Sequence, residues 1–461
     1  MTTRPRIAII GGGCSGVLVA VQLLRNGFEG PIDVVEPRQE LGRGLAYSTP
    51  YDQHLLNVPA DRMSALPERP SHFLEWLHEQ GWPAAASGFF APRKLYGEYL
   101  TDLLRKESSR ASRSNQVHHI RGDAMAVDLS GETASVQLAD GRTIGAARVV
   151  LAIGNPASGP ALNVVTSDTE EICHPSPWLG DALKLRFPSE RILLLGTGLT
   201  AIDSMLAFLG QSEKSQVYMV SRRGMLPQVH TVCRSPTPPP PLRERQKVRL
   251  ILAEVRKNVQ VAAGSDQCWR SSIDGLRSHS NQIWSDLAIA ERERFLRHLK
   301  AYWEPHRHRM APSVGKLTEQ YRASGRLCVL GGRLQRIRRV GDHIEVSLSR
   351  RTAGDLHLLE VDRLINCTGL HESYVDNPRP LIRDLIAKRH ARAHPLGMGF
   401  HTDHEGALLD SAARPSRILF TLGPPRRGQL FETTAVPEIR SQAERLAHRL
   451  IDSLAPFDPC S

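Results

Sequence analysis

Two glycine-rich turns, far apart in the chain, have the spacing of nucleotide-binding loops. The first, Gly11-x-Gly13-x-x-Gly16, follows an apolar run and precedes a segment with helical character. Glycines in such a turn let backbone N–H groups approach a pyrophosphate at the amino end of the helix. Glu36 ends the next apolar run, 20 residues beyond Gly16, where a carboxylate accepts hydrogen bonds from both hydroxyls of an adenosine ribose. The first turn therefore predicts a dinucleotide with free ribose hydroxyls.

The second turn is Gly196-x-Gly198-x-x-Ala201, with Thr200 inside it and alanine at the position that only packs helix against strand. The strand after it ends in Ser221-Arg222-Arg223, where the first unit has an acid. Two guanidinium groups suit a 2′-phosphate better than a free ribose, which favours NADPH over NADH. The alternative is that both arginines simply face solvent. An acidic first site and a basic second site together predict FAD first and NADPH second.

Two strand–turn–helix–strand units must position these turns. The expected elements are strand 6–10, helix 14–26 and strand 32–36, and then strand 191–195, helix 200–209 and strand 217–221. Two further apolar runs, 149–153 and 363–368, stop at Gly154 and Gly369 and are expected to be paired closing strands. The expected fold is therefore α/β, with two Rossmann-like domains.

The segment between the second unit and its closing strand departs from this pattern. Four consecutive prolines within 235–241 predict an extended polyproline II stretch, and Arg-rich helical sequence follows. We expect a discontinuous FAD domain (1–160 and 363–461), an inserted NADPH domain (161–362), and a helical insertion over about 236–316. A final helix is expected from Pro437 to Leu454.

Composition narrows the function classes. The chain has 461 residues, 41% of them hydrophobic, which is typical of a globular protein. No apolar run is long enough for a membrane span and no signal peptide is apparent, so a cytoplasmic protein is expected. The net charge of +11 is spread along the chain without a nucleic-acid motif, so small anions are the expected partners, with a homo-oligomer left open. Seven scattered cysteines without Cys-x-x-Cys argue against a disulfide framework, a metal site and a dithiol reductase.

Several longer motifs extend this pattern over nearly the whole chain. They are Gly-Gly-Gly-Cys-Ser-Gly at 11–16, Leu-Gly-Arg-Gly-Leu-Ala-Tyr at 41–47, His-Leu-Leu-Asn-Val-Pro-Ala at 54–60, Pro-Arg-Lys-Leu-Tyr-Gly-Glu-Tyr at 92–99, Gly-Thr-Gly-Leu-Thr-Ala-Ile-Asp at 196–203, Ser-Arg-Arg-Gly at 221–224, Trp-Glu-Pro-His-Arg-His-Arg-Met-Ala-Pro at 303–312 and Glu-Thr-Thr-Ala-Val-Pro-Glu at 432–438. With these motifs the chain resembles the class B-type flavin monooxygenases. It is especially similar to the bacterial FAD/NAD(P)-binding monooxygenase family that groups FAD-dependent urate hydroxylases with aspartate N-monooxygenases.

The resemblance implies that segments 42–47 and 54–60 wrap the flavin side of FAD and that Asn57, the one candidate catalytic residue, lies near the isoalloxazine ring. Gly423-Pro-Pro-Arg-Arg departs from the Gly-Asp pair usual at that point of the family. The amino end of the helix from Pro437 would face the flavin N1–C2=O edge with its positive dipole. The FAD residues predicted from motif and resemblance are Gly11, Gly13, Cys14, Ser15, Gly16, Glu36, Arg43, Tyr47, His54, Asn57, Gly154, Gly369, Gly423 and Thr434. Those predicted for NADPH are Gly196, Gly198, Thr200, Ala201, Arg222 and Arg223.

The densest cationic run outside the two units is His306-Arg307-His308-Arg309. It is a candidate for binding an anionic substrate, although the NADPH phosphates or solvent are alternatives.

The resemblance implies a monooxygenase that uses FAD, NADPH and O₂ to hydroxylate a small anionic, nitrogen-containing substrate through a flavin C4a-hydroperoxide. N-hydroxylation of an amino acid such as aspartate is favoured, and a urate-like purine is the second choice. Two alternatives stay open: an FAD-dependent NADPH oxidoreductase without oxygen insertion, and a redox-sensing flavoprotein without turnover.

Overall fold

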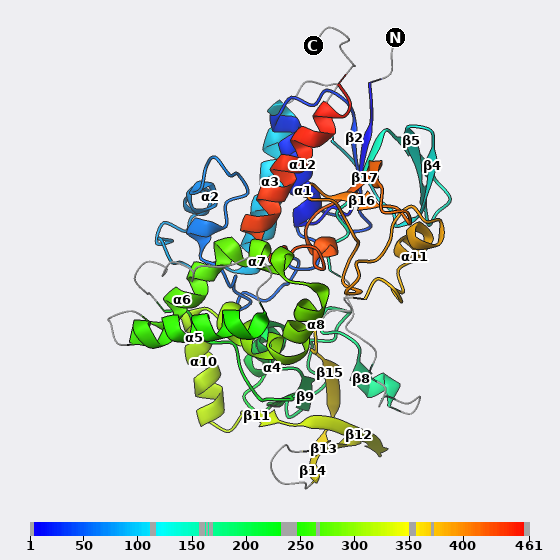
Figure 1. The fold of residues 1–461 in the computed structure, drawn as a ribbon. Helices are drawn as coiled ribbons and strands as arrows, with labels where there is room; N and C mark the ends of the chain where they lie inside the picture. Colours follow the sequence, from blue (N-terminus) through cyan, green and yellow to red (C-terminus); the bar gives the residue numbers. More distant parts are fainter. Residues whose placement is uncertain are drawn as a thin grey trace.

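Two sheets organise the chain in the computed structural model, which describes residues 4–110, 117–155, 162, 165, 169–231, 247–263, 268–349, 356–369 and 373–455. The first sheet has six strands in the order β16-β17-β7-β1-β2-β3, all parallel except β16 (Figure 1). Their bounds are β1 Ile7–Ile10, β2 Ile32–Val35, β3 Val117–Ile120, β7 Arg148–Leu151, β16 Ala407–Leu409 and β17 Pro415–Thr421. The central strands β1 and β2 are buried along their whole length. β1 is accordingly a continuous apolar run, whereas β2 also contains Asp33, which pairs with Arg6 and His118.

The second sheet is parallel throughout, in the order β11-β10-β9-β15-β8. Its strands are β8 Cys173–His174, β9 Arg191–Leu195, β10 Gln216–Ser221, β11 Leu327–Gly331 and β15 Arg363–Asn366. The predicted closing strands thus join different sheets, β7 beside β1 and β15 beside β9. The boundary expected at 363 is therefore wrong: Arg363 begins a strand of the second sheet, and the chain returns to the first unit only after it.

Each sheet is covered by a layer on both faces, because alternate side chains of a strand point to opposite faces. On the first sheet, Ile7 and Ile9 pack with helices α1 Cys14–Arg25, α3 Arg93–Arg110 and α12 Val436–Asp452, which stand side by side in Figure 1. Helix α2 His72–Glu79 extends this layer. Ala8 and Ile10 face the opposite layer, whose elements are β4 Ala124–Ser130, β5 Thr133–Leu138, β6 Thr143–Ala146 and α11 Pro380–Ala387.

The second sheet is covered in the same way. Ile192 and Leu194 pack against helices α4 Leu199–Gln211 and α10 Pro312–Ala323. Leu193 and Leu195 pack against the antiparallel sheet formed by β12 Arg333–Val340, β13 His343–Ser349 and β14 Leu356–Val361. Tyr51 of the first unit packs on the second unit's core, so the two units are in direct contact.

The described part of the predicted insertion is helical, as expected. Its helices are α5 Val248–Ala263, α6 Trp269–Leu276, α7 Ser280–Asp286, α8 Ile289–His298 and α9 Lys300–Arg307, and they lie between α12 and the second sheet in Figure 1. The polyproline prediction for 235–241 lies outside the described residues. Trp284 stacks on Phe431 at 4.9 Å, which ties this helical segment to the chain that enters α12.

Cysteine pairing, membrane-spanning helices and metal-binding clusters complete the description of the fold. Cys268 is disulfide-bonded, a pairing that the scattered spacing of the cysteines did not indicate. Cys14, Cys173, Cys328 and Cys367 are free. Among the helices described in the structure, none has the length and apolarity to cross a bilayer. The described residues also contain no cluster of three or more His, Cys, Asp or Glu side chains suited to a metal ion.

Candidate active site

The first glycine turn packs against the chain at the end of β7. Gly11 has φ +103°, and a Cβ there would lie 2.3 Å from the Ala152 carbonyl oxygen. A Cβ at Gly16 would lie 1.9 Å from the Gly11 carbonyl, so the first turn of α1 passes directly over the loop. Gly13 is the N-cap of α1, without a side-chain cap and without an acidic residue in the first helical turn. The free N–H groups of this helix start therefore remain available for an anion.

Glu36 stands beside this turn as the spacing predicted. Its side chain is buried, and its Oε2 accepts a 2.9 Å hydrogen bond from the Gly12 backbone N–H. Its Oε1 accepts from the Arg38 backbone N–H and guanidinium at 3.2 and 3.0 Å. The carboxylate is thus held at the loop rather than in solvent.

The neighbouring predicted residues Cys14 and Ser15 lie at the start of α1. Burial raises the pKa of the Cys14 thiol to about 12, so this cysteine stays protonated and unreactive at neutral pH. A Cβ on Gly423 would lie 2.9 Å from the Ser15 hydroxyl oxygen, which shows how closely the 423 loop approaches the helix start. Gly423 therefore lies at the first turn, as predicted, despite its unusual sequence context.

The wrapping segment approaches the same turn through Gly44. A Cβ at Gly13 would lie 3.3 Å from the Gly44 Cα, so both positions need glycine to let the two loops meet. Tyr47 stacks against Tyr96 at 4.8 Å between ring centroids, and burial raises the pKa of its phenol. Arg43 forms ion pairs with Glu40 and, at 3.8 Å, with Glu98.

His54, which the resemblance implies on the flavin side of FAD, makes its side-chain contacts between the two units. It is fully buried, with Nδ1 2.7 Å from the Thr49 hydroxyl and Nε2 2.9 Å from the Asp203 backbone carbonyl of α4. Arg93 of the first unit forms an ion pair of 2.9 Å with the Asp203 carboxylate. The contacts of His54 in this structure therefore join the two nucleotide-binding units. Burial lowers the pKa of this imidazole, which favours the neutral form at the junction.

The second turn repeats the architecture of the first. Gly196 has φ +129°, and a Cβ there would lie 2.2 Å from the Cys367 carbonyl, the counterpart of Ala152. Gly198 caps α4, and no other group of the described residues lies within 4 Å of a Cβ built there. The described residues likewise leave space open beside Gly154 and Gly369, which follow the two closing strands at φ +59° and +118°. Thr200 and the fully buried Ala201 follow in the first turn of α4.

The two arginines after β10 are not neutralised by any carboxylate of the described residues. Arg222 is exposed, whereas Arg223 is half-buried with its guanidinium carbon 4.2 Å from the centroid of the Tyr302 ring of α9. The buried Nε of Arg223 has no hydrogen-bond partner in the described part of the chain. Two guanidinium groups with spare donors beside an open glycine turn suit a phosphate.

A cavity of about 1540 Å³, here called the cleft, opens between the first unit, the helical segment and the start of α12. Asn57, Thr434 and Pro437 line it, so the predicted catalytic candidate and the amino end of α12 share one space. The His230 Nε2–H donates a 3.0 Å hydrogen bond to the Asn57 carbonyl. Burial and the nearby Arg309 guanidinium lower the pKa of His230 to about 4, so it is neutral at pH 7.

The run 306–309 does not act as one cationic cluster, which corrects the sequence-based interpretation. Arg307 donates hydrogen bonds of 2.8 and 3.1 Å to Glu432, and Arg309 pairs with Asp274. His308 contacts Glu304 at 2.5 Å. His306 points to a separate apolar cavity, as described below. His306 and Arg307 are the last two residues of α9 and project from different sides of the helix, and the helix ends before His308, so adjacent charges in the sequence reach different partners.

Arg307, His308 and Arg309 do line the cleft, but its arginines without a carboxylate partner among the described residues are ones that sequence reasoning missed. Five arginines and four carboxylates of described residues line it. Arg307, Arg309 and Arg277 are paired with carboxylates, the last with Glu438 at 2.9 Å. The exposed Arg62 and Arg445 have no such partner among the described residues. The available signal was weak: Arg62 closely follows the wrapping segment, and Arg445 lies two turns into α12.

Comparisons with known proteins agree with this geometry. Residues 8–156 match the protein-family model described as FAD-NAD(P)-binding, which confirms a dinucleotide-binding segment around the first turn. The uncharacterized protein YdhS of Escherichia coli K12 is 25% identical over 268 residues, 51% of this chain and 48% of YdhS. The chain thus spans about half the length of that curated relative.

Solved structures match over nearly the full chain at low identity. The reduced form of the ornithine hydroxylase PvdA from Pseudomonas aeruginosa has a TM-score of 0.65 and 16% identity, covering 98% of this chain and 100% of PvdA. The ornithine N-hydroxylase KtzI of Kutzneria sp. 744, solved with reduced FAD, NADP⁺ and L-ornithine, has a TM-score of 0.63 and 16% identity, covering 97% and 98%. The predicted fold class is confirmed: this chain has the two-domain fold of FAD- and NADPH-binding flavoproteins.

Proposed function

We propose that the protein is an FAD- and NADPH-dependent monooxygenase that hydroxylates an amino nitrogen of a small anionic substrate. The observation that carries the proposal is the opposite charge beside two otherwise equivalent turns. Glu36 is held at the first turn, whereas Arg222 and Arg223 stand without carboxylate partners at the second. A carboxylate suits free ribose hydroxyls and paired guanidinium groups suit a 2′-phosphate, so FAD belongs to the first turn and NADPH to the second.

The residues at the first turn fit FAD. The loops meet glycine to glycine at Gly13 and Gly44, which leaves backbone rather than side chains facing the pyrophosphate position. Open space beside Gly154 and the close approach of Gly423 complete a groove of backbone along the predicted cofactor path. When bound there, FAD would accept hydride from NADPH and supply the oxygen chemistry.

The chain's own residues would bind and orient the substrate and shield the reacting atoms from water. Helix α12 begins at Val436 on the cleft, where its N–H groups favour negative charge on a bound partner. The buried Arg307–Glu432 pair and the Arg277–Glu438 pair hold the helical segment against this helix start. That contact would keep bulk water from the reacting atoms during turnover.

An amino dicarboxylate such as aspartate is the proposed substrate. Its two carboxylates require two cations that are not already neutralised, and Arg62 and Arg445 are such cations in the cleft. PvdA and KtzI are ornithine hydroxylases. Ornithine carries a second amino group instead of a second carboxylate, and arginines without carboxylate partners disfavour that group by like-charge repulsion.

The test is NADPH oxidation by FAD-reconstituted protein with L-aspartate or L-ornithine, combined with mass spectrometry for a product containing one added oxygen atom. We expect aspartate to stimulate NADPH oxidation and to yield a hydroxylamine. Arg445→Gln should raise the KM for aspartate roughly tenfold (about 1.4 kcal/mol), whereas His448→Gln, at an exposed position one turn away, should not. NADPH oxidation without an oxygenated product for any amino acid would instead favour the plain oxidoreductase, and failure to bind FAD would exclude both enzymes.

A further inference from the structure

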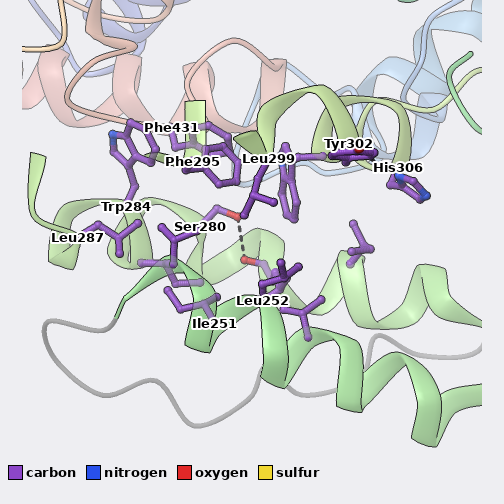
Figure 2. A pocket seen from close by; sticks show the side chains of 16 residues that line it. Ile251, Leu252, Ser280, Trp284, Leu287, Phe295, Leu299, Tyr302, His306 and Phe431 are labelled. Carbon is purple, nitrogen blue, oxygen red and sulfur yellow. Dashed lines mark hydrogen bonds between the residues drawn. The ribbon is translucent and has the colours of Figure 1, made fainter. Parts of the chain in front are cut away.

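A second cavity, of about 230 Å³, lies inside the helical segment (Figure 2). We call it the apolar cavity. Its walls come from α5, α6, α7, α8 and α9 together with the chain just before α12. Prominent wall residues are Ile251, Leu252, Trp284, Leu287, Phe295 and Phe431. Nothing in the proposed oxidation chemistry requires this space.

The walls offer a ligand almost no polar contact. Ser280 donates its hydroxyl to the Leu276 carbonyl at 2.9 Å. His306 Nδ1 donates to the Tyr302 carbonyl at 2.7 Å, so this ring nitrogen is already engaged at one end of the cavity. The described lining contains no Asp, Glu, Lys or Arg side chain. A charged group entering the cavity would lose its hydration without compensation, so the occupant must be uncharged.

The size of the apolar cavity sets the scale of that occupant. An engineered apolar cavity of about 150 Å³ stays free of water and binds benzene. The apolar cavity is larger, at about 230 Å³, and aromatic rings such as Trp284 and Phe431 form part of its wall. A bicyclic aromatic molecule, or a branched aliphatic one of the same bulk, fits this volume and chemistry.

The apolar cavity and the cleft lie on opposite faces of shared helices. On α6, Leu276 lines the apolar cavity whereas Asp274 lines the cleft. At the end of α9, His306 lines the apolar cavity whereas Arg307 lines the cleft. A ligand in the apolar cavity would therefore not be part of the substrate in the cleft, although both would contact the same helices.

We propose that the apolar cavity is a separate binding site for a small uncharged aromatic molecule. The proposal does not depend on FAD, NADPH or turnover, so its test uses binding alone. The probe is indole, titrated into the full-length protein by isothermal calorimetry. We expect saturable binding of one indole per chain.

A matched pair of variants locates the site. Leu252 is partly buried in the wall, whereas its neighbour Ala253 is exposed. Leu252→Trp should fill the apolar cavity and weaken indole binding at least tenfold, while Ala253→Trp should bind as the wild type does. Ile283→Phe, at another partly buried wall position, provides a second filled variant if Leu252→Trp does not fold by circular dichroism.

Three outcomes would overturn the proposal. The first is an absence of saturable indole binding to the wild type. The second is equal binding by the filled variants and by Ala253→Trp. The third is a dimer in sedimentation that Leu252→Trp dissociates, because the apolar cavity would then be a contact between copies of the chain.

Discussion

The guanidinium of Arg307 and the carboxylate of Glu432 form two hydrogen bonds of 2.8 and 3.1 Å, with both residues almost fully buried. This pair connects the end of α9 to the chain that enters α12 across 125 positions of sequence. Removing one partner of such a pair leaves an uncompensated buried charge, which costs more than the pair itself contributes. Arg307 therefore has a structural role that a reading of local charge does not reveal.

Arg307→Met should lower the free energy of unfolding by about 3–5 kcal/mol, because Glu432 would then be buried without a partner. The double variant Arg307→Met with Glu432→Leu should recover much of that loss. Urea denaturation of the two single variants and the double variant measures the coupling. Arg294→Met, which breaks an exposed pair with Glu291, should change stability by less than about 1 kcal/mol. Strictly additive losses from Arg307 and Glu432 would refute the coupling.

Arg222→Ala should raise the KM for NADPH about tenfold while leaving that for NADH nearly unchanged, since a charged hydrogen bond to phosphate contributes about 1.5–3 kcal/mol. Arg222 is the cleaner choice of the two arginines because Arg223 also stacks on Tyr302. Steady-state kinetics with both cofactors provide the measurement. Lys214→Ala, an exposed cation of the same unit, serves as the control. A parallel change for NADPH and NADH would show that Arg222 does not read the 2′-phosphate.

The second turn offers a comparison between two glycines. Gly198→Ala adds a methyl group to open space and should leave the melting temperature of the free protein nearly unchanged, yet weaken NADPH binding by blocking the helix start. Gly196→Ala places the methyl group 2.2 Å from the Cys367 carbonyl at a φ of +129°, so it should destabilise the fold itself. Differential scanning calorimetry and NADPH titration distinguish the two. Normal NADPH affinity in Gly198→Ala would place the cofactor elsewhere.

His230 predicts a pH effect on stability. Because the pKa of His230 is lowered from 6.5 to about 4, the unfolded chain binds more protons than the folded one between these values. The stabilisation is therefore fully present above about pH 6.5 and is lost as the pH falls towards 4. His230→Asn should remove this part of the acid sensitivity, about 1–3 kcal/mol after allowance for partial solvent exposure. Denaturation at about pH 5 and pH 7.5 tests it, with the exposed His298→Asn as control; identical pH slopes for all three proteins would exclude the effect.

The local sequence pattern was sufficient to predict the two nucleotide-binding units. Strand, glycine turn and helix follow from apolar periodicity and from φ values that only glycine adopts easily, so α1 begins at Cys14 as predicted and β9 has the predicted bounds. Both closing strands were also recognised, because buried parallel strands are continuous apolar runs. The sheet that each strand joins depends on tertiary pairing, and there the boundary at 363 was misplaced.

The charged residues of the cleft could not be assigned from sequence for a related reason. The partners of Arg307 and Arg309 are Glu432 and Asp274, which lie far along the chain, so neutralisation is invisible in the local run. Arg62 and Arg445 come from separate elements and meet only in the fold. The contact of His54 with the Asp203 carbonyl of α4 is also invisible in the sequence, because it joins residues 149 positions apart.

The carbonyl groups against which the two glycine turns pack have a consequence for biosynthesis. Gly196 rests against the carbonyl of Cys367, which directly follows β15, and the ribosome makes β15 only after all of the helical segment. The second turn thus lacks its supporting strand while most of the molecule is already outside the exit tunnel. Ala152, whose carbonyl lies against the first turn, is synthesised much earlier. The first unit is nevertheless completed last, because β17, Gly423 and α12 follow β15 in the chain. A nascent chain should therefore complete its NADPH turn before its FAD site, which sets an order of maturation for the two halves of the protein.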